Sequence, residues 1–445
     1  MKKILILALK WLGGIVLLLA LAVIYLYNHD RGPSDAPMGE HVTANEDFLT
    51  AEIVRSAIDV SIQDRTKLIQ NTAAHEPPPT TDKTAPGFRS HNYQRDVHTK
   101  GHGCVKATFK VDRVPPQFAF GVFAKPAEYD ALVRFSSGNP GVFPDSEKDA
   151  RGIAIKLFNV PGKKLLPGEE DDTTQDFLLM NNPIFFFRTI EEYAQFNQML
   201  AYNDALHYFI NPRVSPLRWH LRELKLLFDT KKKPPESLLT EPYWSASAYA
   251  LGPSQYVHYK MVPCDRNKPM LDAKAKREYG YDFLRLDLAK QAATGGACFD
   301  FMVQPQVPGK NMPVEDTTVE WSESDSPFVK VASLELKPDP DMNTAERNTQ
   351  CEGLSYNPWH SLVEHRPVGV MNRARKALYQ EMGRFRRAKN CPEFCQDKCS
   401  AGNCAAGCVE GCVSACPLLN EPAGTELPAG ACKAEPALKA KLQAK

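Results

Sequence analysis

The chain has 445 residues, of which 43% are hydrophobic, and its formal net charge is +1. This length and composition are those of a globular protein with one large core or two smaller ones. Because basic and acidic residues nearly cancel, no field of one sign favours nucleic acid as a partner, and that class is set aside.

The N-terminus predicts a membrane anchor. Apolar residues run from Ile4 to Tyr27 with an interruption at Lys10, and the stretch from Trp11 to Tyr27 has 17 residues, close to the roughly 20 that cross a bilayer. The run lacks the small-residue site at which signal peptides are cleaved. Lys2, Lys3 and Lys10 lie before the stretch from Trp11 to Tyr27, and positive charges are retained on the cytoplasmic side of a membrane. We expect an uncleaved transmembrane helix over residues 1–30, with the N-terminus cytoplasmic and the body periplasmic or otherwise extracytoplasmic. A cleaved signal peptide is the alternative.

A tether with a short helix follows over residues 31–87, because the segment from Glu46 to Ile69 has helical periodicity between Pro-containing ends. The body, residues 88–389, contains eight strand-like runs. These are 104–111, 117–123, 131–137, 152–158, 175–180, 255–262, 298–305 and 328–336. Such a series predicts an α+β fold built on a closed antiparallel β-barrel of about eight strands, since closure removes exposed edges.

Helical patterns interrupt and follow these strands. Two helices are expected from Thr189 to Leu200 and from Leu217 to Leu227, and one basic helix from Val368 to Lys389, ending near Asn390.

The tail, residues 390–445, holds eight of the 12 cysteines, at spacings of three or four intervening residues up to Cys416. A zinc or iron–sulfur site, a redox role and a disulfide-stapled tail all remain open for it, because the spacing is unspecific.

The basic helix carries the first chemical motif. Arg375 and Tyr379 lie four residues apart, so they share a helix face and the guanidinium can reach the phenol oxygen. A phenol has an ordinary pKa near 10, and a ferric ion helped by an arginine would hold it as phenolate. Tyrosine is an uncommon haem ligand that catalase uses.

Four blocks in order resemble the catalase superfamily. They are Arg95-Asp-Val97-His98, then Val133-Arg134-Phe-Ser136-Ser with Asp149-Ala-Arg-Gly152, then Asp176 to Phe186, and finally Asn357-Pro-Trp with Arg375 to Arg386. The resemblance covers about 88–200 and 345–388, and it is loose over 201–344.

The resemblance implies a haem b site with Tyr379 as the iron ligand and His98 on the opposite face as general acid and base. It implies that Ser136 hydrogen-bonds the other ring nitrogen of His98 and that Asn181 binds the second peroxide oxygen. The remaining expected cofactor-binding residues are Phe185 and Val97 at the haem face, Arg375 beside the phenol, and Arg95, Arg134 and Arg386 for the propionates.

Two departures from the family pattern affect these assignments. One residue fewer separates the asparagine from Pro183, which makes Asn182 a second candidate. Only 66 residues follow Tyr379, so the family's long helical C-terminal domain has no counterpart, and we interpret the chain as a reduced, membrane-anchored form.

The expected function is haem-dependent decomposition of hydrogen peroxide outside the cytoplasmic membrane. One alternative is a catalase-related enzyme for organic or fatty-acid hydroperoxides, in which threonine is expected where this chain has Val97. The other is a haem-binding or redox scaffold whose function resides in the tail. An oligomer is compatible with the sequence.

Overall fold

The computed structural model describes residues 2–28, 38–72 and 93–399. The strands are β1 (Gly101–Val111), β2 (Ala127–Ser137), β3 (Arg151–Leu157), β4 (Gln175–Met180), β5 (Tyr243–Trp244), β6 (Tyr249–Ala250), β7 (Tyr256–Pro263), β8 (Cys298–Pro305) and β9 (Val329–Leu336). The helices are α1 (Lys2–Asn28), α2 (Glu46–Thr72), α3 (Ile190–Ala201), α4 (Ala205–Phe209), α5 (Leu221–Thr230), α6 (Ala273–Glu278), α7 (Phe283–Thr294), α8 (Ala345–Gly353) and α9 (Val370–Cys399).

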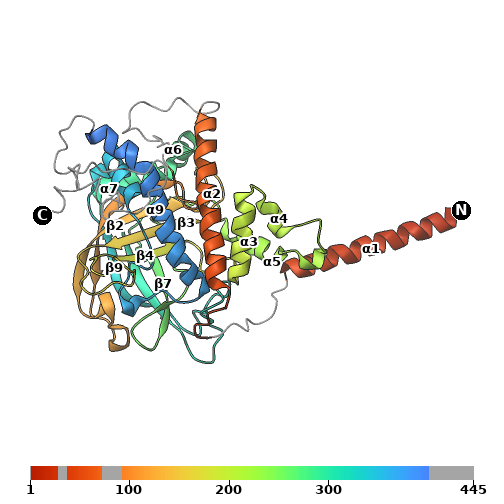
Figure 1. The fold of residues 1–445 in the computed structure, drawn as a ribbon, viewed down its shortest axis with the longest axis horizontal. Coiled ribbons are helices and arrows are strands. Elements are labelled where there is room, and N and C mark those ends of the chain that lie inside the picture. Colours follow the sequence, from red (N-terminus) through yellow and green to blue (C-terminus); the bar gives the residue numbers. More distant parts are fainter. Residues whose placement is uncertain (1, 29–37, 73–92, 400–445) are drawn as a thin grey trace, which may run out of the picture.

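The strands form a closed antiparallel barrel, as predicted. The order is β5-β4-β3-β2-β1-β9-β8-β7, and pairing of β5 with β7 closes the ring at eight strands, with β6 as an added partner of β7. Figure 1 shows the barrel with α9 across its front, α6 and α7 above it, and α2 to α5 to its right.

Burial alternates along β1 in the way expected for a strand of a barrel. Val105, Ala107, Phe109 and Val111 are buried, while the residues between them are partly or fully exposed. Side chains of a strand alternate between its two faces, so one face of each strand fills the barrel interior. The interior is aromatic, with Phe109, Phe177 and Phe301 in contact at centroid distances of 4.9 to 5.9 Å.

One predicted strand is wrong. The run 117–123 forms two short 3-10 helices, Pro116–Phe118 and Gly121–Phe123. Pro115 and Pro116 cannot donate backbone hydrogen bonds, and Gly121 has a positive φ of 53°. The apolar residues of this run are buried in the core without joining the sheet.

A layer of helices packs against the barrel. α2, α3 and α9 share a second apolar cluster that includes Ile53, Ile190 and Leu378, and in Figure 1 α2 and α9 cross the same face of the barrel. Arg373 of α9 joins these parts, because its guanidinium pairs with Glu46 of α2 at 2.6 Å and with Glu315 at 2.9 Å. The helices expected at 46–69, 189–200, 217–227 and 368–389 all occur, with ends shifted by several residues.

No helix among the described residues is both long and apolar enough to cross a membrane. The predicted transmembrane helix, single-pass topology and membrane contact are therefore wrong. Lys10 interrupts the apolar residues of α1, and the unbroken stretch from Trp11 to Tyr27 has 17 residues. At 1.5 Å per residue it covers about 25 Å of a hydrocarbon core of roughly 30 Å.

The four cysteines outside the tail form two disulfides, Cys104–Cys351 and Cys264–Cys298, with Cα–Cα distances of 5.9 and 5.5 Å. The first joins β1 to α8 and the second joins the end of β7 to the start of β8. α9 continues to Cys399 instead of ending near Asn390. The rest of the predicted Cys-rich tail lies outside the described residues.

Candidate functional site

His98 lies in the segment before β1 and has a left-handed backbone conformation, with φ of 55°. Non-glycine residues at positive φ are uncommon, and they cluster at functional sites where the surroundings hold them. The backbone N–H of His98 donates to the carbonyl oxygen of Gly138 at 3.2 Å. Its Nδ1 lies 3.0 Å from Oγ of Ser136 on β2, the contact that the sequence predicts. Nε2 makes no hydrogen bond within the described part of the chain.

Gly152 on β3 lies directly beside this imidazole. A Cβ at position 152 would come within 2.6 Å of Cε1 of His98 and 3.0 Å of Oγ of Ser136. Only glycine leaves room for the ring in this position. The sequence motif contains Gly152, but an Arg-Gly pair alone carries little information, so its role emerges from the structure.

The surroundings of His98 keep its imidazole neutral. Burial lowers the pKa of His98, and the positive charges of Arg134, Arg375 and Arg95 lower it further, to about 3. A neutral imidazole is the form that accepts a proton. Arg375 acts on His98 from α9, so the early segment and the late helix face the same region.

Arg375 and Tyr379 lie one turn apart on α9, but no hydrogen bond joins their side chains in the described structure. The Arg375 guanidinium lies 3.3 Å from Oγ of Ser247 and 3.3 Å from Oδ1 of Asn372. Burial alone would lower the pKa of Arg375, yet the phenol groups of Tyr379, Tyr249 and Tyr193 raise it above its ordinary value.

Phe185 lies beside Arg375. The Phe185 ring centroid is 6.0 Å from the Arg375 guanidinium carbon and 5.8 Å from the ring of Tyr193. Val97 is half-buried next to His98. The Phe185 ring therefore offers an apolar surface next to α9.

The three arginines predicted to bind propionates converge on one acidic residue, Glu352 of α8. Arg95 pairs with its carboxylate, and Arg134 donates from Nε to Oε1 at 3.0 Å. Arg386 donates to its backbone carbonyl oxygen. Burial would raise the pKa of Glu352, but Arg134, Arg95 and Arg386 outweigh it and hold the pKa far below its ordinary value.

Glu352 was not identified from the sequence. Its neighbour Cys351 is bonded to Cys104, whose register partner across the β1–β2 pair is Arg134. The disulfide therefore fixes Glu352 next to the arginines. No local sequence motif indicates a contact between residues 218 positions apart.

Asn181 and Asn182 both follow β4 and both are buried. Oδ1 of Asn181 accepts from the backbone N–H of Arg151 at 2.7 Å, and its Nδ2 donates to Glu241 at 3.0 Å. Nδ2 of Asn182 donates to the carbonyl oxygen of Ile184 at 2.7 Å and to Oγ1 of Thr230 at 3.2 Å. Asn181 keeps one amide hydrogen without a partner within the described residues, whereas Asn182 uses both.

The donor set fits a haem. A phenol next to a buried guanidinium suits a ferric ion, and apolar rings suit the macrocycle. The arginine cluster already binds a carboxylate, that of Glu352, and bidentate guanidinium groups suit the carboxylates of propionates.

No protein-family model matches the chain. Two curated relatives are catalases. Catalase A of Pseudomonas putida is 24% identical over 281 residues, and a catalase of an Onchocerca volvulus endobacterium is 24% identical over 291 residues. Each match covers 58% of this chain and 55% of the relative, so the chain spans about half the length of the curated relatives it matches.

Solved catalase structures share the fold. A fungal catalase crystal structure aligns with a TM-score of 0.50 and 18% identity over 72% of this chain and 62% of its own. Catalase A from Saccharomyces cerevisiae aligns with a TM-score of 0.50 and 16% identity over 81% of this chain and 68% of its own. The chain is therefore similar in sequence to two catalases, and it shares the fold of solved catalase structures.

Proposed function

We propose that the protein decomposes hydrogen peroxide to water and oxygen with a haem b held by Tyr379. The observation that carries the proposal is the His98–Ser136 pair, with Nδ1 and Oγ 3.0 Å apart, in a region also under the charge of Arg375. The sequence similarity to two curated catalases supports the same activity.

His98 would move the proton. Because Ser136 occupies Nδ1, the second ring nitrogen, Nε2, remains to accept a proton from one peroxide oxygen and return it to the other. This transfer turns one oxygen into a water leaving group. Asn181 would donate its remaining amide hydrogen to the peroxide and polarise the O–O bond.

The other residues would hold the cofactor. Arg375 would lie beside the iron ligand Tyr379, Phe185 and Val97 would offer apolar contact, and the guanidinium groups of Arg95, Arg134 and Arg386 would bind the propionate carboxylates. Haem iron bound in this way would supply the two-electron redox chemistry that peroxide disproportionation requires. One peroxide is then reduced to water while a second is oxidised to oxygen.

Absorption spectroscopy of the haem-supplemented protein tests the axial ligand. We expect a Soret band and high-spin ferric features in the wild type and an altered spectrum in Tyr379→Phe. Tyr202→Phe is the matched control, because Tyr202 is exposed at the end of α3. Identical spectra of wild type and Tyr379→Phe would exclude this ligand.

Oxygen release from hydrogen peroxide tests the reaction. We expect His98→Ala to abolish most of it while keeping the Soret band. Wild-type protein that binds haem but releases no oxygen would overturn the proposal. Faster turnover of an organic hydroperoxide than of hydrogen peroxide would assign the enzyme to the organic hydroperoxide class.

A further inference from the structure

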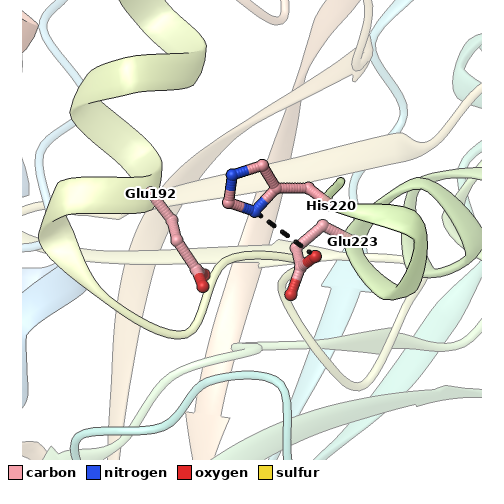
Figure 2. A group of neighbouring side chains, drawn as sticks. All are labelled: Glu192, His220 and Glu223. Carbon is pink, nitrogen blue, oxygen red and sulfur yellow. Dashed lines mark ion pairs between the residues drawn. The ribbon is translucent and has the colours of Figure 1, made fainter. Parts of the chain in front are cut away.

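Three metal-ligating side chains meet outside the His98–Tyr379 site. Glu192 lies in the first turn of α3, His220 immediately precedes α5, and Glu223 lies in the first turn of α5. One ligand atom from each residue can be chosen so that all three lie within 4.8 Å of one another. Figure 2 shows the imidazole between the two carboxylates, with Nδ1 of His220 3.6 Å from Oε2 of Glu223.

The three side chains are held in place by their surroundings. The His220 ring stacks on Tyr208 with centroids 4.4 Å apart and an interplanar angle of 10°. Oε2 of Glu192 accepts from the backbone N–H of Arg188 at 2.8 Å. The backbone N–H of His220 donates to the carbonyl oxygen of Phe209 at 3.0 Å. A fixed constellation of this kind binds a cation with little loss of side-chain freedom.

The chemistry of the group is that of a ligand set. Nδ1 of His220 is buried and makes no hydrogen bond to any described residue, and a buried ring nitrogen of this kind normally has a partner. Both carboxylates lie at helix N-termini, where the helix dipole favours their ionised, ligating form. Glu223 and Glu192 are only 1% and 9% exposed, so the ligand atoms are largely shielded from water.

Two arginines lie beside this group of side chains. Arg222 NH1 lies 3.8 Å from Oε1 of Glu223, while its NH2 donates to Oγ1 of Thr318 at 2.8 Å. Nε of Arg188 pairs with Oδ2 of Asp316 at 2.9 Å.

We propose that Glu192, His220 and Glu223 bind a divalent transition metal ion of the zinc class. One nitrogen and two oxygen ligands suit Zn²⁺ better than Ca²⁺ or Mg²⁺, which take oxygen ligands. Three protein ligands leave the fourth tetrahedral position to water. Bound there, the ion links α3 to α5 and stabilises the helical layer.

Zinc titration of the full-length protein after treatment with a chelator tests the site. Because cysteine thiolates are zinc ligands, the comparison is between variants that all retain the Cys-rich tail. We expect wild type to bind one equivalent of zinc more than His220→Ala. In Glu192→Gln we expect the affinity for this equivalent to fall more than about 100-fold, because losing even a residue that only orients a ligand lowers metal affinity by about 10–100-fold. His207→Ala is the matched control, because His207 is an exposed histidine of the neighbouring α4.

Thermal unfolding supplies a second readout. Zinc binding to the folded state raises the unfolding midpoint by mass action, and we expect this increase in wild type and His207→Ala to exceed that in His220→Ala. Far-UV circular dichroism verifies that each variant is folded. Equal zinc stoichiometry in wild type and a folded His220→Ala would overturn the proposal.

Discussion

At the scale of single residues, Gly152 determines whether His98 can occupy its position. We predict that Gly152→Ala displaces the imidazole, because the added Cβ would lie 2.6 Å from Cε1. A displacement of about 1 Å at a catalytic group costs roughly 100-fold in rate, and we expect a loss of kcat/KM of that order with the barrel intact. Gly280→Ala, whose Cβ meets only ordinary contacts, should keep full activity. Full activity in Gly152→Ala would contradict the role of Gly152 in positioning a catalytic His98.

The lowered pKa of His98 predicts the acid side of the pH profile. Its folded-state pKa is about 3, below the ordinary 6.5, so the imidazole stays neutral when the pH falls through 6.5. We therefore expect kcat/KM for peroxide to be flat from neutral pH down to about pH 5. Protons bind His98 more readily in the unfolded chain, so this group lowers stability progressively as the pH falls from 6.5 towards 3. An acid limb centred near the ordinary pKa of histidine would contradict the prediction.

Glu352 competes for the arginines that we assign to haem propionates. We predict that Glu352→Gln binds haem at least about tenfold more tightly, because a hydrogen bond to a charged group contributes about 1.5–3 kcal/mol that haem no longer has to displace. The cofactor-free variant should unfold at a lower temperature, since Arg134 and Arg95 lose their buried counter-ion. Haem titration followed at the Soret band measures the affinity. Weaker binding by the variant would instead assign Glu352 a supporting role.

At the scale of elements, Arg373 attaches α9 to α2. We predict that Arg373→Ala lowers the free energy of unfolding by about 3 kcal/mol, because it leaves the buried carboxylates of Glu46 and Glu315 uncompensated. Arg384→Ala removes an exposed pair with Glu381 on the same helix and should cost less than about 1 kcal/mol. Urea denaturation of both variants measures the difference, and equal values would show that the α9 contacts do not depend on this cluster.

The type of an element, helix or strand, was predictable from the sequence where a regular hydrophobic pattern extended over many residues. Seven strand-like runs and four helices occur where expected, because alternation along strands such as β1 and apolar stripes on α2, α3 and α9 are local signals. β5 and β6 were not predicted, since two-residue strands have no periodicity. The run 117–123 was predicted as a strand because its apolar residues are buried, although two prolines and Gly121 direct it out of the sheet.

The candidate site was predictable only as a set of residues. The family order of the blocks predicts His98, Ser136, Arg375 and Tyr379 as site residues, and the structure contains the His98–Ser136 contact. The role of Glu352 could not be derived in this way, because it depends on packing between α8 and β2. The transmembrane helix was wrong because one lysine divides an apolar stretch that otherwise approaches the necessary length.

At the scale of the whole molecule, the disulfide Cys104–Cys351 joins residues 247 positions apart. A crosslink over so long a loop restricts the unfolded chain strongly, and we predict that replacing both cysteines with alanine lowers the free energy of unfolding by about 4 kcal/mol. A non-reduced proteolytic digest analysed by mass spectrometry should contain linked peptides from these two positions. Linked peptides that pair Cys104 with Cys264 or Cys298 instead would contradict the described connectivity.

The closure of the barrel has a consequence for its dynamics. β5 meets β4 through one residue pair, Met180 with Trp244, and β7 through two, whereas β1 and β2 are paired along their whole lengths. Fewer backbone hydrogen bonds have to break at this seam than anywhere else in the ring, so local opening begins there at a fraction of the global unfolding free energy. Asn181 directly follows Met180. Transient separation of the seam therefore loosens the chain next to the proposed peroxide-binding amide while the opposite wall of the cylinder stays intact.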